Sequence, residues 1–139
     1  MRKHVLLLVL IMAVICLALS GCVNVDRQLE KAVAEVNATQ YPAQIDEETI
    51  LDSLSCAPGR NLTYHYTLLT FTKENLKPET LKAMEIGLRI NLIKVIRSGV
   101  KVTKQFRKAG VIFHHEYRDR DGNMVVNIVL TPKDYNFKE

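Results

Sequence analysis

The sequence lacks the short motifs that mark the common enzyme classes. It contains no Gly-X-Ser-X-Gly elbow, no His-Glu-X-X-His zinc motif and no glycine-rich phosphate loop. Asp46, Glu47 and Glu48 could in principle supply an acid and a base. Acids close to Pro42 at the entrance to a strand are more typical of a solvated loop, however. The sequence therefore predicts a protein that is not an enzyme and that needs no cofactor.

Long apolar runs are also scarce. The main one covers residues 5–19 and follows the charged start Arg2, Lys3 and His4. A helix that spans a bilayer needs about 20 consecutive apolar residues, so this run is too short to be retained as one. A basic start followed by a short apolar run is typical of a cleaved leader.

The run ends in Leu19, Ser20, Gly21 and Cys22. This stretch resembles the lipobox of a bacterial lipoprotein signal peptide. The resemblance implies that residues 1–21 are removed and that Cys22 becomes the first residue, carrying a diacylglyceryl group and usually a third acyl chain such as palmitate. Several acyl chains together make a long-lived anchor. By analogy with enterobacterial sorting, Val23 in place of Asp implies the inner leaflet of the outer membrane.

Cysteine is rare, with three in the whole chain. Cys16 would leave with the leader and Cys22 would carry lipid, which leaves Cys56 alone in a compartment where disulfides form. An intramolecular disulfide is thereby excluded. Cys56 is then a buried thiol, the donor of an intermolecular disulfide, or a reactive group.

Excess charge is small as well. The chain has 19 basic and 15 acidic residues, and loss of Arg2 and Lys3 leaves 17 against 15, a net charge of +2. A nucleic-acid-binding domain is usually far more basic, so nucleic acid is not expected as a partner. The remaining length suits one domain.

Three segments are expected: the signal peptide at 1–21, a lipidated segment at 22–43 and one globular domain at 44–139. Apolar residues at helical spacing predict a helix over 23–37, either a tether or a helix that docks on the domain. Strands are predicted at 50–56, 62–72, 111–118 and 123–131, the last pair joined by a hairpin loop at Gly122. A long helix should start near Pro78 and continue, with a kink or an end at Ser98–Gly99, to about residue 108.

This order predicts an α+β two-layer sandwich, an antiparallel sheet of about four strands (β-β-α-β-β) packed on one long helix. Leu81, Met84, Leu88, Leu92 and Val95 form the stripe expected to face the sheet. A second aliphatic stripe, roughly opposite the first, is left for the N-terminal helix, a partner or a second copy. Its members are Ile86, Ile90 and Ile93.

Histidines are the remaining candidates for metal binding. His114 and His115 are neighbours on a strand and should point to opposite faces, so they cannot easily share an ion. A site that uses His65 needs the second and third predicted strands to be adjacent. The loop from Asp119 to Asn123 does not match a calcium-binding loop, because its glycine is fourth rather than sixth. No metal site is predicted.

The segment from residue 97 to residue 115 contains no acid. If it is helical throughout, four cations at intervals of four, three and four residues share one face of the helix, and a fifth lies beside them. They could meet lipid phosphates, anionic polysaccharide or an acidic protein surface, or they could form an ordinary solvated face. The candidates are Arg97, Lys101, Lys104, Arg107 and Lys108.

Taken together, these features favour a small lipoprotein anchored in the cell envelope through Cys22, with an envelope protein as its partner or with self-association. Its role would be that of an assembly or accessory factor of an envelope machine, or of an immunity or inhibitor protein. The alternative is a module that binds an anionic envelope component such as lipopolysaccharide or cell-wall polymer. A hydrolase that uses His114 or His115 with a carboxylate comes last.

Overall fold

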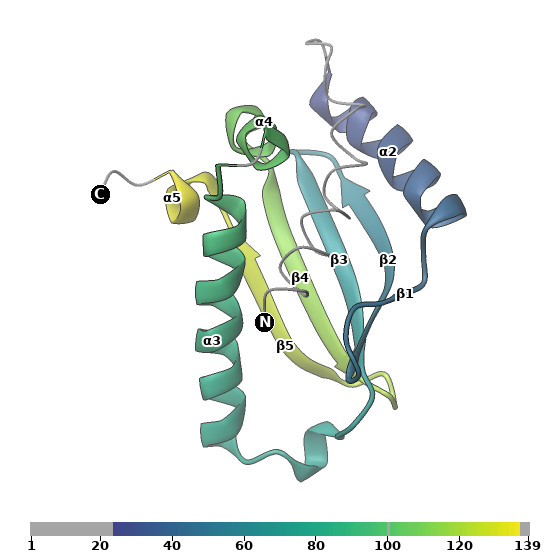
Figure 1. Cartoon of the computed structure of the whole chain (residues 1–139), viewed down its shortest axis with the longest axis vertical. Helices are drawn as coiled ribbons and strands as arrows, with labels where there is room; N and C mark the ends of the chain where they lie inside the picture. Colours follow the sequence, from purple (N-terminus) through teal and green to yellow (C-terminus); the bar gives the residue numbers. More distant parts are fainter. Residues whose placement is uncertain (1–23, 100, 137–139) are drawn as a thin grey trace.

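The computed structural model describes residues 24–99 and 101–136, apart from the side chains of residues 101–103. Helices lie against one face of a mixed β-sheet, so the predicted α+β two-layer class is confirmed (Figure 1). The leader and Cys22 lie outside the described residues. The elements are α2 (Val25–Thr39), β1 (Ala43–Gln44), β2 (Thr49–Ala57), β3 (Asn61–Leu68), the 3₁₀ turn η1 (Lys73–Asn75), α3 (Pro78–Ile96), α4 (Lys101–Ala109), β4 (Ile112–Asp119), β5 (Met124–Leu130) and α5 (Pro132–Tyr135).

The five strands lie in sequence order, from β1 at one edge to β5 at the other. β1 is an additional two-residue strand paired with β2. Three of the four pairings are antiparallel, but β3 and β4 run parallel. The expectation of an entirely antiparallel sheet was therefore wrong for this pair. Its physical reason is the helical connection between the strands, since a long crossover can return the chain to the end from which β3 started.

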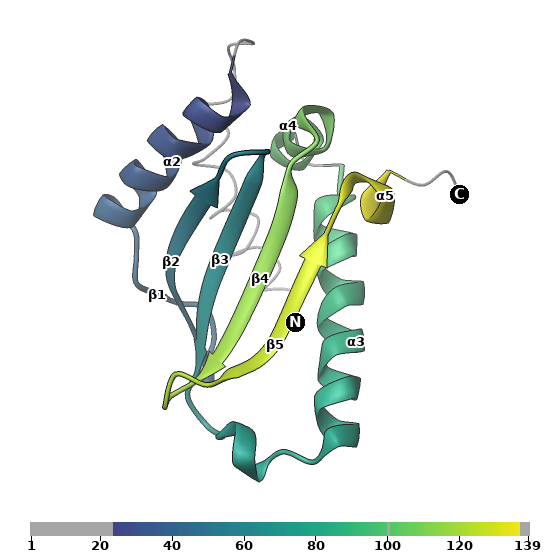
Figure 2. The same cartoon turned by 180° about the vertical axis from the view of Figure 1, so that it is seen from behind.

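Alternating burial separates the two faces of the sheet. Along β3, Leu62, Tyr64, Tyr66 and Leu68 are buried while the residues between them are partly exposed, and β4 repeats the pattern. The buried set faces the helices. Figure 2 shows the other face, in front of which no described helix lies.

α2 is a docked helix and not a detached tether. It packs along β2 and buries Leu29, Val33 and Val36 in the same core as the strands. Asn24 caps its first turn by accepting a hydrogen bond from the N–H of Arg27. The first described residue is therefore already fixed to the fold.

α3 packs along β5 at the opposite edge of the helical layer (Figure 1). It ends at Ile96, with Arg97 as its C-cap, and the chain then turns through Ser98 and Gly99 before α4. α4 crosses one end of the sheet. There the rings of Phe106 and Phe113 pack edge to face, with their centroids 5.5 Å apart. The long helix is thus two helices.

The C-terminal segment also holds a short helix, α5, that was not among the predicted elements. Thr131 and Asp134 form a capping box at the start of α5, and Asp134 also accepts a hydrogen bond from Arg89 of α3 at 2.6 Å. The hydroxyl of Tyr135 donates to the carbonyl of Val111 at 2.7 Å. These contacts fix α5 to α3 and to the start of β4.

Candidate functional site

The second aliphatic stripe of α3 reaches solvent. Ile86 and Ile90 are 51% and 49% exposed, and they are the exposed large hydrophobic side chains of the described chain. Ile93 is partly buried against the core. The opposite stripe faces inward, ending in the buried Leu92 and Val95. The two-sided character predicted for this helix is present, with Ile86 and Ile90 forming the free side.

The predicted basic set is divided between two helices. Arg97 caps α3, whereas the others belong to α4. Arg107 points back to α3 and donates hydrogen bonds to the carbonyls of Ile96 and Ser98. Lys104 and Lys108 are exposed, while the side chain of Lys101 is among those not described. The hypothesis of four cations on one continuous helix face therefore does not hold, because the helix is interrupted at Ser98–Gly99.

The end of the molecule that carries α4 is tied to the start of α2. The carboxylate of Asp26, in the first turn of α2, accepts hydrogen bonds from the backbone N–H groups of Gly59 (3.1 Å) and Arg60 (2.7 Å). The guanidinium of Arg60 in turn donates to the carbonyl of Ala109 at 2.9 Å. The N-terminus of α2, the β2–β3 loop and the end of α4 therefore share one end of the fold (Figure 1).

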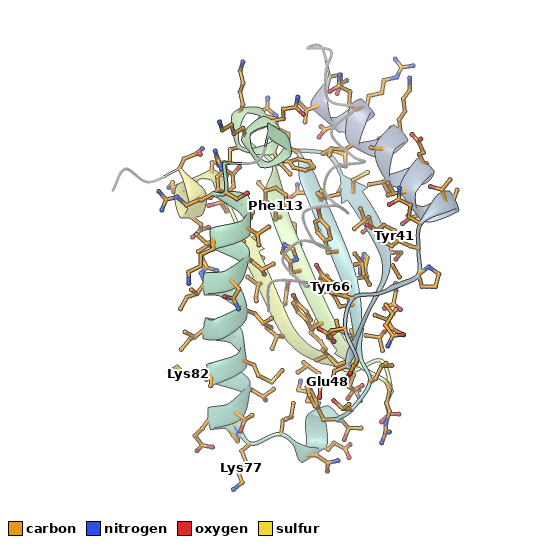
Figure 3. The ribbon with its side chains drawn as sticks, viewed as in Figure 1. Tyr41, Glu48, Tyr66, Lys77, Lys82 and Phe113 are labelled. Carbon is orange, nitrogen blue, oxygen red and sulfur yellow. The ribbon has the colours of Figure 1, made fainter. Side chains whose placement is uncertain are left out.

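Aromatic rings stack across the helix-facing side of β3 and β4. Tyr64 stacks on His115 with ring centroids 4.7 Å apart, and Tyr66 stacks on Tyr117 at 4.4 Å. Tyr66 lies near the middle of the sheet and Phe113 near α4 (Figure 3). Burial, with a smaller contribution from His114, lowers the pKa of His115 to about 3. Burial likewise raises the pKa of Tyr66, so both rings are neutral at physiological pH.

The open face of the sheet carries a chain of polar side chains. Ser55 Oγ lies 2.7 Å from His65 Nε2, and His65 Nδ1 lies 3.2 Å from Glu116 Oε2. Arg118 then contacts the same carboxylate at 3.3 Å. These distances resemble the pairwise contacts of a Ser-His-Glu triad. Ser55 is exposed and His65 and Glu116 are partly exposed, so solvent reaches all three.

The histidine predictions can now be judged. His114 donates a hydrogen bond from Nε2 to the side-chain oxygen of Asn61 on the open face, while His115 is buried on the other, so the two do point to opposite faces. The second and third predicted strands, β3 and β4, are neighbours, and they bring His65 to Glu116. Within the described ranges, no three His, Cys, Asp or Glu residues are grouped to hold a metal ion.

Asp119 organises the β4–β5 hairpin. Its carboxylate accepts hydrogen bonds from the backbone N–H groups of Lys73, Asp121 and Asn123, each at 2.9 Å. These bonds, led by that from Lys73, hold the pKa of Asp119 below its usual range. Gly122 takes a positive φ of 85° in the turn. The loop is thus a hairpin turn, as the sequence indicates.

Cys56 is a partly buried free thiol on β2. Burial raises its pKa, and the nearby carboxylates of Glu30 and Asp26 raise it further. A raised pKa disfavours the reactive thiolate. Among the described helices, none has the length and hydropathy needed to cross a bilayer.

Comparison with known proteins gives a family and a shared fold. A family model described as "Domain of unknown function (DUF8479)" matches residues 24–126. No curated protein matches the sequence. A Pseudomonas aeruginosa protein inferred to be secreted has the same fold, with a TM-score of 0.62 and 15% identity over 80% of this chain and 92% of its own.

Two further structures with this fold are pilotins. EpsS, from the type 2 secretion system of Vibrio vulnificus, has a TM-score of 0.57 and 14% identity over 82% of this chain and 97% of its own. AspS, the type II secretion system pilotin of Vibrio cholerae, has a TM-score of 0.52 and 16% identity over 79% of this chain and 94% of its own. At these identities the likeness establishes the fold.

Proposed function

The chain belongs to the DUF8479 family, and we propose that this member is a lipid-anchored accessory protein of a cell-envelope machine that binds one of the machine's protein components. The observation that carries the proposal is the fold it shares with two secretion-system pilotins over nearly their whole lengths. The expected lipidation signal at Leu19–Cys22 supports the same location. A fold alone does not determine function, so the proposal depends on the surfaces described above.

The anchor would be directly attached to the folded domain. Val23 is the single residue between Cys22, the predicted lipid attachment site, and Asn24, the cap of α2. A fully extended residue adds only about 3.5 Å to the length of the chain, so the lipid attachment site would lie close to the first turn of α2. The end of the fold that contains the start of α2 and the end of α4 would therefore lie at the membrane surface, in the inner leaflet of the outer membrane if the rule for Val23 applies.

Two surfaces are candidates for the protein contact. The first is the α4 end, where Lys104 and Lys108 are exposed. The other cations of the predicted set are Arg97, Lys101 and Arg107, of which Arg107 is bonded to the end of α3. The second is the outer face of α3 around Ile86 and Ile90. We assign the component of the machine to the α4 end, since that end would lie closest to a machine built in the membrane.

Charge reversal tests this assignment. Lys104→Glu with Lys108→Glu should lower capture of the partner several-fold in intact-cell cross-linking, because a rim charge of the wrong sign opposes association. Lys77→Glu with Lys82→Glu is the matched control: both residues are exposed at the start of α3, at the opposite end of the molecule from α4 (Figure 3). Equal capture by both double variants would remove the α4 end from the account.

A second candidate function is the binding of an anionic envelope component, such as lipopolysaccharide. The supporting observation is that α4 contains no acid and exposes Lys104 and Lys108 at the end expected to face the membrane. Charge-led binding should weaken steeply between low and physiological ionic strength. If the captured partner is a protein and its capture persists in 0.5 M salt, the result would favour the accessory role.

A further inference from the structure

The isoleucine surface of α3 consists of Ile86, Ile90 and the exposed Gly87 between them, and it lies between two lysines. A helix turns by about 100° per residue, so Lys82 and Lys94 lie about 60° to either side of the two isoleucines. Lys82 comes one turn before the isoleucines and Lys94 one turn after them, and both lysines are exposed. Lys82 lies on the side of α3 that faces away from the sheet (Figure 3). The apolar surface is therefore bordered by positive charge on both sides.

The charges of these two lysines are not balanced within the part of the chain that the structure describes, where neither takes part in an ion pair. The acids of α3 lie elsewhere. Glu79 is in the first turn of the helix, and Glu85 lies about 120° from the isoleucines. Arg89 is a further cation beside the surface, but it already forms an ion pair with Asp134. The two lysines are thus available to a group outside the described fold.

The contact that suits this surface is a helix with acids beside an apolar stripe of its own. Charged residues that border the apolar seam of a helix pair select the partner, and lysines favour glutamates across the seam. At Gly87 an added Cβ would meet no described atom within 4 Å, so a second backbone can approach closely there. A second copy of α3 would bring cations and not acids to the sides of the seam, and like charges oppose pairing.

We propose that the isoleucine surface of α3 binds an amphipathic helix of another envelope protein, one that carries Glu or Asp on both sides of its apolar stripe. The inference goes beyond the proposed function, because it adds a second protein contact and leaves the α4 end to the component of the machine. Such a helix would lie along the side of the domain, so the contact is compatible with attachment of the α4 end to a membrane (Figure 1).

Designed peptides test this surface on the full-length protein, purified from membranes and placed in nanodiscs of phosphatidylcholine. Two fluorescent peptide helices share the same apolar stripe, and one carries Glu and the other Lys on both sides of it. Fluorescence anisotropy should show roughly tenfold tighter binding of the Glu peptide. Lys82→Glu with Lys94→Glu should reverse this preference. Ile86→Ser with Ile90→Ser should weaken binding of the Glu peptide several-fold.

The matched control is Arg27→Glu with Lys31→Glu, which reverses two exposed cations on α2, at the other edge of the helical layer. This variant should retain the preference for the Glu peptide. A loss equal to that of the Lys82/Lys94 variant would show general attraction between an acidic peptide and a basic protein, and it would overturn the assignment to α3. Wild type that binds both peptides equally, or neither, would overturn it as well.

The class of the natural partner is tested in intact cells with a photo-reactive residue at position 90 of the full-length chain. Mass spectrometry of the adducts should identify a segment of another protein that has acids beside an apolar stripe. Adducts formed only with a second copy of this chain, only with lipid, or with a segment that lacks acids would contradict the proposed partner. The readout does not use the α4 end, so its failure is distinguishable from failure of the proposed function.

Discussion

The hydroxyl of Tyr66 lies 3.1 Å from Nδ1 of His115, inside the layer between the sheet and the helices. His115 is 3% exposed, and its ring stacks on Tyr64. A buried polar ring is stable when it is neutral and hydrogen-bonded, and Tyr66 supplies the hydrogen bond. The lowered pKa of His115 therefore makes the fold sensitive to acid.

The pH dependence has a defined sign. The pKa of His115 is about 3 in the folded chain and 6.5 without burial. Between these pH values the unfolded state binds the proton more readily than the folded state does. The contribution of His115 to the free energy of unfolding therefore falls as the pH decreases from 6.5 towards 3, and it is constant above pH 6.5. The slope from this one group is at most about 1.4 kcal/mol per pH unit. Urea unfolding of His115→Phe should lack this component, whereas His114→Phe, on the open face, should retain it. Equal pH slopes for wild type and His115→Phe would contradict the assignment.

Asn37 of α2 is hydrogen-bonded to the backbone of β2 like a neighbouring strand. Its side chain donates to the carbonyl of Leu54 and accepts from the N–H of Leu54, both at 2.8 Å. Asn37→Ala would leave both backbone groups without these bonds and should cost roughly 1–3 kcal/mol in urea unfolding. Asn91→Ala, at an exposed position of α3, is the control. A loss below about 0.5 kcal/mol for Asn37→Ala would show that water replaces the side chain.

Arg107 and Lys108 are adjacent, but replacing each with alanine should change the free energy of unfolding by different amounts. Arg107 contacts the carbonyls at the end of α3, whereas Lys108 is exposed. Arg107→Ala should reduce the free energy of unfolding by about 1–3 kcal/mol, because hydrogen bonds from a charged donor are lost. Lys108→Ala should stay within about 0.5 kcal/mol of wild type. Equal losses in thermal or urea unfolding would show that Arg107 does not fix α4.

Ser55 should not behave as an enzymatic nucleophile. A triad needs preorganised donors in a site that excludes water, and Ser55 is exposed on the open face of the sheet. Treatment with a fluorophosphonate probe should therefore label wild type and Ser55→Ala equally, at background level. Labelling of wild type that Ser55→Ala abolishes would establish a reactive serine and revive the hydrolase hypothesis.

Local pattern was sufficient for much of the fold. The strand-favouring residues of β3, the helical spacing in α3 and the turn at Gly122 are short-range features, and each led to an element close to its observed place, although β3 ends at Leu68 and not at residue 72. The parallel pairing of β3 with β4 was not, because it depends on where a distant crossover returns the chain. α5 was also missed, although Thr131, Pro132 and Asp134 form a recognisable start signal for a helix.

The candidate surfaces were predictable in part for the same reason. The outward stripe at Ile86 and Ile90 follows from helical periodicity, and the structure leaves it exposed. The role of Arg107 could not be read from its charge, since it depends on the break at Ser98–Gly99 that places α4 beside the end of α3. The contact of Ser55 with His65 required the register of β2 and β3.

Membrane attachment at Cys22 is the expectation on which the accessory role depends, and it can be measured together with partner capture. A photo-reactive residue at position 104 of the full-length protein should cross-link in intact cells to a protein component of an envelope machine, and Cys22→Ser should abolish both the adduct and incorporation of labelled palmitate. Adducts to lipid alone, or an undiminished protein adduct with the unlipidated Cys22→Ser chain, would contradict the account.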